Sequence, residues 1–197
     1  MTVGRTKATY ADVLAAPEHK VAEVLDGELY LSPRPAPRHA LAHTVLGSLL
    51  GPPFHMGRGG PGGWLILMEP ELHLHDDIVV PDLAGWRIER MPRLPKEAFF
   101  SVAPDWVCEV LSPSTRRIDR VLKRPIYAKN GVGHMWLVDP LDRSLETHKL
   151  MREHWLWLGV GVDNERVRAE PFDAIELELG PLWETAPPAP ADPAPPP

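Results

Sequence analysis

A helical segment between two short apolar runs is the feature that most restricts how this chain can fold. The runs 105–112 and 134–140 are typical of buried strands, and residues 114–130 between them begin with Ser and Thr and end at Asn-Gly. A strand–helix–strand unit places its strands parallel in one sheet, with the helix across one face. Pro125 interrupts the helical segment, so we expect a kink there or a shorter helix.

Most other segments favour antiparallel pairing. Asp26-Gly27 lies between two apolar runs, which predicts a tight hairpin, and Asp76-Asp77 lies between the runs 64–75 and 78–86, which predicts a second one. The C-terminal segments that alternate like strands are 145–150, 154–160 and 174–180.

Two further helices and one loop complete the predicted core. Thr9 and Asp12 resemble a capping box for a short helix, residues 39–50 show helical spacing, and the Gly- and Pro-rich segment 51–63 predicts a mobile connection. We therefore expect a mixed sheet with a helix on each face, in the α+β or α/β class. An N-terminal hairpin and C-terminal antiparallel strands extend it.

Chain length and composition set the outer limits. The 197 residues predict one domain over residues 1–185, followed by an Ala- and Pro-rich tail, 186–197, which we expect to be disordered or polyproline-like. Cys108 is the single cysteine, it lies in an apolar run, and no secretory signal is recognisable, so we expect a buried thiol and a cytoplasmic protein. The net charge of −6 argues against a protein that grips nucleic acid mainly by overall charge.

Two acids, Asp82 and Glu109, lie inside runs whose other residues are mostly apolar and typical of a buried core. One such acid can simply point outward from a strand. Two on central strands are harder to explain, because carboxylates about 4 Å apart repel by roughly 4 kcal/mol at an effective dielectric near 20. Such a pair requires a shared proton, a cationic side chain or a metal ion. Oxygen ligands without cysteine favour Mg²⁺ or Mn²⁺ over zinc.

A cationic side chain is available in the helical segment. Asp119, Lys123 and Tyr127 recur every four residues, so a helix places them on one face. An exposed Asp–Lys pair explains the same spacing. Four arginines in this segment could form a local basic surface: Arg116, Arg117, Arg120 and Arg124.

The order of these motifs, from VAEVLDGELY through His39, IVVPDL, VCEVLSPST and Asp119-xxx-Lys123-xxx-Tyr127 to GVGHMWLVDP, resembles the Uma-type restriction endonuclease family. That family belongs to the PD-(D/E)xK nuclease superfamily, and the resemblance covers roughly residues 10–180. It implies that Asp82 and Glu109 bind a divalent cation, with the Val110 carbonyl as a further ligand. The superfamily lysine, two residues after the glutamate, is here Leu111, and Lys123 matches the lysine that this family carries on the following helix.

The same resemblance assigns Glu23 to a second cation or to a water, although a solvated strand acid is the alternative. His39 matches a histidine at the start of a helix, where it could contact substrate or cap the helix. The resemblance predicts an Mg²⁺- or Mn²⁺-dependent nuclease acting on DNA, as a monomer or homodimer. RNA as the target and a catalytically silent binding or assembly module on a nuclease-like scaffold remain alternatives.

Other candidate residues have simpler explanations. His73 and His75, followed by Asp76 and Asp77, could hold zinc, but the alternating leucines are typical of a sheet with one wet face. Glu69 is unassigned. Trp155 and Trp157 share a strand face, which packing or a subunit interface explains better than base stacking.

Overall fold

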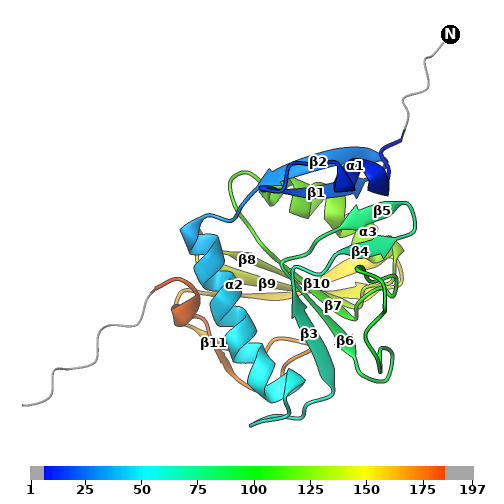
Figure 1. Cartoon of the computed structure of the whole chain (residues 1–197). Coiled ribbons are helices and arrows are strands. Elements are labelled where there is room, and N and C mark those ends of the chain that lie inside the picture. The colour runs from blue at the N-terminus through cyan, green and yellow to red at the C-terminus, as the bar shows by residue number, and fades with distance from the viewer. Residues whose placement is uncertain (1–6, 185–197) are drawn as a thin grey trace, which may run out of the picture.

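The computed structural model describes residues 7–184, so the predicted tail at 186–197 lies outside the described residues (Figure 1). The helical elements are Tyr10–Leu14 (α1), Pro37–Leu50 (α2), the π-helical turns Gly51–His55 and Ile118–Lys123 (η1, η2), Arg124–Lys129 (α3) and the short 3₁₀ turn Gly180–Leu182 (η3). The strands are Lys20–Leu25 (β1), Glu28–Pro33 (β2), Trp64–Met68 (β3), Leu72–Leu74 (β4), Asp77–Val79 (β5), Leu83–Arg87 (β6), Trp106–Val110 (β7), His134–Asp139 (β8), Ser144–Met151 (β9), His154–Val162 (β10), Arg166–Val167 (β11) and Leu177–Glu178 (β12).

A six-stranded sheet in the order β10-β9-β8-β7-β6-β3 forms the centre of the molecule. Its neighbours pair antiparallel except β7 and β8, which pair parallel across the η2–α3 helical segment. This confirms the mixed sheet with one crossover. A four-stranded sheet in the order β2-β1-β5-β4 lies beside it, and β11 and β12 form a separate ribbon.

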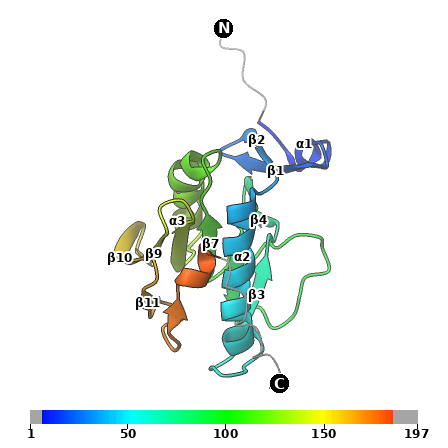
Figure 2. The same ribbon diagram turned by 90° about the vertical axis from the view of Figure 1, so that its left-hand side faces the viewer.

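The central sheet has one helix on each face, as expected (Figures 1 and 2). Trp106, Cys108 and Val110 of β7 pack in the apolar cluster that contains α2, while the alternating Val107 packs in the cluster that contains α3. Because successive strand residues face opposite sides, Glu109 falls on the α3 side of the sheet. Cys108 is buried, as predicted, and burial raises the pKa of its thiol well above the ordinary value.

The two long apolar runs 64–75 and 78–86 divide between the sheets, which the sequence did not predict. The β4–β5 hairpin is present, but β3 and β6 pair with each other in the central sheet. The breaks occur at Pro70 and Pro81, which have no N–H for a sheet ladder. Asp82 therefore lies in the junction between β5 and β6 and not within a strand.

The regular α-helix that contains Pro125 is short, as one of the two expectations stated, since α3 spans only Arg124–Lys129. The π-helical turn η2 immediately precedes α3, and Pro125 occupies the first turn of α3. Proline clashes with the carbonyl four residues earlier in a regular α-helix, and a wider π turn relieves this conflict.

Two other predictions need correction. The segment 51–63 was expected to be a mobile connection, but it begins with η1, which buries Pro53 and Phe54. Only Leu177–Glu178 of the predicted strand 174–180 is extended, and its partner β11 was not predicted. Among residues 7–184, no helix is long and apolar enough to cross a bilayer.

Candidate active site

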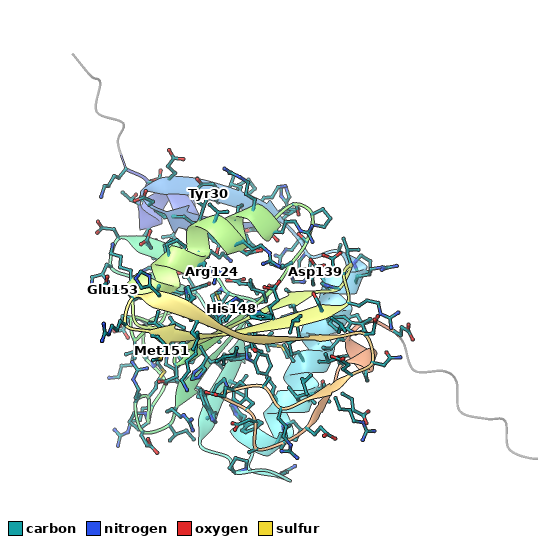
Figure 3. The ribbon with its side chains drawn as sticks, turned by 180° about the vertical axis from the view of Figure 1, so that it is seen from behind. Tyr30, Arg124, Asp139, His148, Met151 and Glu153 are labelled. Atoms are coloured by element: carbon teal, nitrogen blue, oxygen red, sulfur yellow. The ribbon has the colours of Figure 1, made fainter. Side chains whose placement is uncertain are left out.

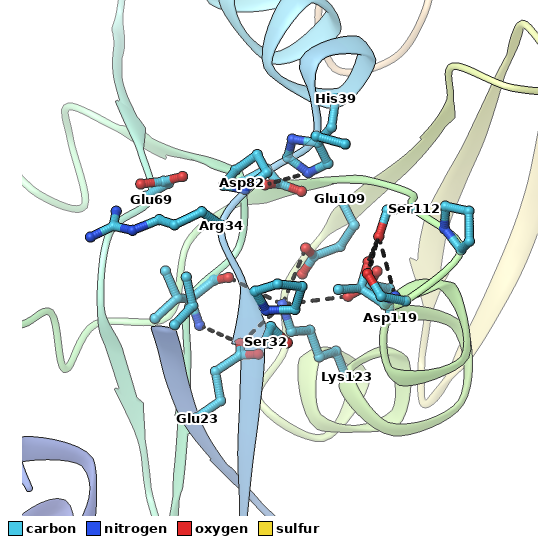
Figure 4. Close-up of a pocket in the computed structure, with 18 residues that line it drawn as sticks. Glu23, Ser32, Arg34, His39, Glu69, Asp82, Glu109, Ser112, Asp119 and Lys123 are labelled. Carbon is cyan, nitrogen blue, oxygen red and sulfur yellow. Dashed lines mark hydrogen bonds and ion pairs between the residues drawn. The ribbon is translucent and has the colours of Figure 1, made fainter. Parts of the chain in front are cut away.

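A pocket of about 240 Å³ lies where the β5–β6 junction, the end of β7, the first turn of α2 and the start of the η2 helix meet. Figure 4 shows its charged side chains converging from these separate elements. The ionisable side chains that line it include every acid and base predicted for the site except Tyr127, namely Glu23, His39, Asp82, Glu109, Asp119 and Lys123.

Asp82 is held by groups from α2, β7 and the segment after β3. Its Oδ1 lies 3.0 Å from Nε2 of His39 on α2, and its Oδ2 accepts the Val110 N–H of β7 at 2.7 Å. Its backbone carbonyl lies 2.9 Å from Nε2 of His43, also on α2, and accepts the Glu69 N–H at 2.8 Å. The break at Pro81 thus gives Asp82 a fixed position at the pocket wall.

Glu109 is almost completely buried, and both of its oxygens have partners. The Tyr127 hydroxyl donates to Oε1 at 2.5 Å, and Nζ of Lys123 lies 3.3 Å from Oε2. Both partners come from the helical segment that covers this face of the sheet. The face predicted from the four-residue spacing is therefore directed at Glu109.

Lys123 occupies the centre of a cage of oxygens. Its Nζ lies 2.9 Å from Glu23 Oε1, 3.5 Å from Asp119 Oδ1 and 3.1 Å from the Val80 carbonyl, in addition to Glu109. The Lys123 side chain is only 5% exposed, so the interpretation of Asp119 and Lys123 as an exposed surface pair is wrong. Position 111, where the superfamily pattern has a lysine, is a leucine that is buried in the core. Lys123 brings an ammonium into the same pocket from the helix instead.

Glu23 is buried on β1 and is not a solvated strand acid. Its Oε1 accepts the Val80 N–H at 2.8 Å while it pairs with Lys123. The pairing with Lys123 ties the four-stranded sheet to the site, because Glu23 lies on β1 of that sheet and Lys123 lies on η2.

The charges in this cluster do not balance, since Glu23, Glu109 and Asp119 share one ammonium, while Asp82 pairs with His39. Burial, together with Asp119, Asp82 and Glu23, raises the pKa of Glu109 well above its usual range, although Lys123 acts in the opposite direction. Burial likewise raises the pKa of Asp119 to about 6. Burial lowers the pKa of Lys123, but Glu109 and the other acids outweigh it, so this pKa is raised well above its ordinary value.

His39 lies in the first turn of α2 and contacts Asp82, so it does not cap the helix; the N-cap residue is Ala36, and no side-chain cap bond forms there. Burial is the largest single influence and lowers the pKa of His39, but the hydrogen bond to Asp82 and the charges of Asp82, Asp119 and Glu69 together outweigh it, so the pKa is raised. Its second ring nitrogen, Nδ1, is buried and has no partner among the described residues. His39 thus positions Asp82 in this structure.

His73 and His75 do not form a joint site. His73 stacks on Phe99 and pairs with Glu71, while His75 lies beyond the end of β4 with φ +59° and bonds Asn130. Asp77 is buried and accepts the Asp26 N–H at 2.7 Å. Within residues 7–184, no group of three or more His, Cys, Asp or Glu side chains is arranged to enclose a metal ion, and the structure offers no support for zinc here.

Two of the four arginines predicted to form a basic surface are paired with acids. Arg116 pairs with Asp139 and Asp142, and Arg120 pairs with Glu146. Viewed from behind, Arg124 and Asp139 lie along the α3 side of β8 and β9 (Figure 3). Arg116 and Arg120 thus join the helix to the sheet, whereas no described ion pair involves Arg117 or Arg124.

Some pocket residues were not predicted from the sequence. Ser112, Ser114 and Thr115 bring hydroxyls to the wall directly after β7, and Arg34 and Glu69 flank the opening (Figure 4). From the sequence, the hydroxyl residues that follow Glu109 predict only the start of a helix. The Ser112 hydroxyl does accept the Thr115 N–H there, at 3.2 Å. No local pattern marks Arg34 or Glu69, because only the tertiary fold brings them to this pocket.

The comparisons with known proteins agree with this architecture. The profile of the Uma2 family, described as "Putative restriction endonuclease", matches residues 8–180. The chain belongs to the Uma2 family. A crystal structure of "a putative nuclease belonging to DUF820" from Anabaena variabilis superposes with a TM-score of 0.70 at 22% identity, over 89% of this chain and 97% of that one. The likeness shows a shared fold that is consistent with a restriction-endonuclease-like core. No curated protein matches the chain.

Proposed function

We propose that this member of the Uma2 family hydrolyses DNA phosphodiester bonds with the help of a divalent cation, Mg²⁺ or Mn²⁺. The observation that carries the proposal is the meeting of Asp82, Glu109 and Lys123 in one pocket from three separate elements. Two carboxylates and a buried ammonium are the groups that metal-assisted phosphoryl chemistry needs in one place.

The donor set fits a hard divalent cation. The candidate ligands are carboxylate oxygens of Asp82 and Glu109, with the Val110 carbonyl as a further one, and oxygen donors without sulfur are what Mg²⁺ and Mn²⁺ prefer. The pocket also holds more carboxyl groups than cationic partners, since Glu23, Glu109 and Asp119 share the Lys123 ammonium and Asp82 pairs with His39. When bound, the cation would polarise the scissile phosphate and lower the pKa of the attacking water.

The side chains around the two ligands hold them in position. In the structure, His39 and the Val110 N–H fix the two oxygens of Asp82, and Tyr127 and Lys123 fix those of Glu109. Lys123 would in addition stabilise negative charge that develops on the phosphate oxygens. Glu23 and Asp119 hold the ammonium of Lys123, so we assign them a positioning role.

Cleavage of DNA by purified protein tests this function. Supercoiled plasmid is incubated with Mg²⁺ or Mn²⁺, and wild type is compared with Asp82→Asn and Glu109→Gln. We expect cleavage by wild type that is lost on chelation and reduced at least a hundredfold in each variant. Equal nicking by all three proteins would mean that a contaminating nuclease cuts the plasmid, and the proposed activity would then be wrong. A single-stranded RNA of matched length, run in parallel, distinguishes an RNA substrate.

A silent scaffold is the second candidate, and the closed cage around Lys123 favours it. The ammonium already occupies the centre between three carboxylates, which is a stable arrangement without any metal. Titration calorimetry separates the two functions. Binding of Mn²⁺ by wild type that disappears in Asp82→Asn supports the enzyme, and no binding at millimolar Mn²⁺ supports the scaffold.

A further inference from the structure

The outer strand of the central sheet, β10, has a composition unusual for an exposed edge. It runs from His154 to Val162 and is an edge strand of the six-stranded sheet. Figure 2 shows it at the margin of the molecule. From Trp155 to Val162 the strand has neither a charged residue nor a proline. Several of its apolar side chains are exposed, among them Leu156 at 50%, Trp157 at 58% and Val160 at 47%.

Two other sheet edges in the described part of the chain, those of β3 and β4, are protected. The Ile66 amide of β3 donates to the His55 ring, and β4 is bridged by Phe100, which exchanges backbone hydrogen bonds with Glu71 and His73. Monomeric proteins usually blunt a free edge with charges, prolines or covering segments, because unpaired backbone groups recruit other strands. On β10, the Val162 N–H donates to Glu165, Gly161 lies against Val167 and Leu179, and the register shifts between Trp157 and Gly159. No described backbone hydrogen bond covers the outer edge of residues 155–158.

We infer that β10 pairs antiparallel with β10 of a second copy of this chain, about a two-fold axis. An edge strand is self-complementary in this arrangement, since each copy offers the same backbone groups in the opposite direction. The two six-stranded sheets would then continue into one. The proposal does not rest on hydrolysis, because none of the pocket residues lies on β10.

Charge and area both favour a second copy as the occupant. Each chain carries a net charge of −6, so two copies repel unless they meet through an uncharged surface, and residues 155–162 provide one. The exposed apolar residues of β10 together with Met151, labelled in Figure 3, present on the order of 500 Å² per copy. Pairing along the edge would bury part of this area on each copy together with the backbone edge, so the interface would lie near the lower limit of specific interfaces, about 1,000 Å² in total.

A hollow beside the strand gives the second copy a place to insert side chains. It holds about 340 Å³ and is lined by Leu158 and Val160 of β10 and by Val167 and Ala169 of the following segment. Trp157 lies on the same strand and is the largest exposed apolar side chain of the patch. Buried aromatic residues at the centre of an interface commonly supply most of its binding energy. Trp157 is therefore the residue to substitute first.

Sedimentation equilibrium of the full chain tests the interface. At micromolar concentration we expect a mass of twice 22.0 kDa for wild type. We expect a monomer for both Trp157→Glu and Val160→Lys, because each places charges at the pairing edge. Leu94→Glu is the matched control, since Leu94 is 62% exposed in a loop away from β10 and its variant should stay dimeric. Far-UV circular dichroism and thermal unfolding establish that each variant is folded.

Hydrogen exchange of wild type gives a readout that needs no substitution. Amides of residues 155–161 should exchange faster on dilution below the dimer dissociation constant, while amides of β7 should not change. A wild type that is monomeric at high concentration would overturn the proposal, and so would a dimer that persists in both β10 variants. Slow exchange of β10 at every dilution in a monomer would mean that another part of the same chain covers the strand, which also overturns it.

Discussion

Lys123 is the residue on which the electrostatics of the buried cluster depend. Its ammonium contacts Glu23, Glu109 and Asp119, and all four side chains are buried. Removing one partner of a buried ion pair leaves uncompensated charge, which typically destabilises a protein by about 3–5 kcal/mol. We expect Lys123→Met to lower the free energy of unfolding by this amount in urea titrations at neutral pH.

The matched control for that substitution is Lys129→Met, which removes an exposed lysine from the last turn of the same helix. A solvated lysine near a helix C-terminus contributes about 0.3–1 kcal/mol at most. A loss below 1 kcal/mol for Lys123→Met would show that the cage does not hold a charged lysine.

Asp119 gives the cluster a signature that depends on pH. Its pKa is raised from 3.8 to about 6, with burial as the largest cause. A carboxyl with a raised folded-state pKa binds its proton more tightly in the folded protein, so its contribution to stability is full below 3.8 and is lost as pH rises through 6.

As the pH rises from 4 to 7, the free energy of unfolding of wild type should therefore fall relative to that of Asp119→Asn, by on the order of 2–3 kcal/mol. Urea unfolding of both proteins at these two pH values, with chelator present, measures the difference. A stability difference that is constant across this range would contradict the raised pKa.

At the scale of elements, two glycines on neighbouring elements should respond oppositely to the same substitution. A Cβ at Gly47 of α2 would meet the terminal methyl of Met68, whose side chain is exposed and can move. Alanine favours a helix over glycine by about 1 kcal/mol, so Gly47→Ala should be neutral or stabilising. A Cβ at Gly85 of β6 would lie 3.2 Å from the rings of Trp64 and Trp106, which are both buried and cannot yield.

Overpacking of this kind destabilises by about 1–3 kcal/mol, so Gly85→Ala should lower the midpoint of thermal unfolding while Gly47→Ala should not. Differential scanning calorimetry of the two variants beside wild type measures both effects. Equal destabilisation by both would mean that the Met68 side chain is as fixed as the two tryptophans.

Elements that depend on neighbouring residues could be predicted, and those that depend on distant partners could not. The capping box at Thr9 and Asp12 is present, and Asp26 and Gly27 form the hairpin turn with φ of 51° and 77°. Both are decided within a few residues. The division of the runs 64–75 and 78–86 between two sheets depends on partners far away in the chain, since Ile78 pairs with Val24 while Leu83 pairs with Cys108.

The same distinction holds for the whole molecule and its pocket. The sequence pointed to Asp82 and Glu109 as unusual, and the spacing of Asp119, Lys123 and Tyr127 gave the correct helix face. Whether these groups meet depends on the crossover between β7 and β8, which lays that face against Glu109. Neither the contact of His39 with Asp82 nor the pairing of the helix arginines with Asp139 and Glu146 has a local signal.

The charges of the whole cluster predict how a divalent cation changes the thermal stability of the protein. Lys123 and a divalent cation use the same carboxylates, so the ammonium limits how strongly the pocket attracts a cation. A ligand that binds only the folded state stabilises it by about 2.7 kcal/mol at a hundredfold excess over its dissociation constant. For a protein of this size each kcal/mol raises the unfolding midpoint by about 2–4 °C.

We therefore expect millimolar Mn²⁺ to raise the unfolding midpoint of wild type by several degrees, and to raise that of Lys123→Met by more, because the metal then replaces the missing ammonium. Asp82→Asn should show no rise, since it removes a proposed ligand from the exposed side of the pocket. Ca²⁺ at the same concentration controls for general charge screening. An equal rise in all three proteins would mean that Mn²⁺ acts elsewhere on the surface, and Lys123 and His39 would then be the partners that account for the carboxylates.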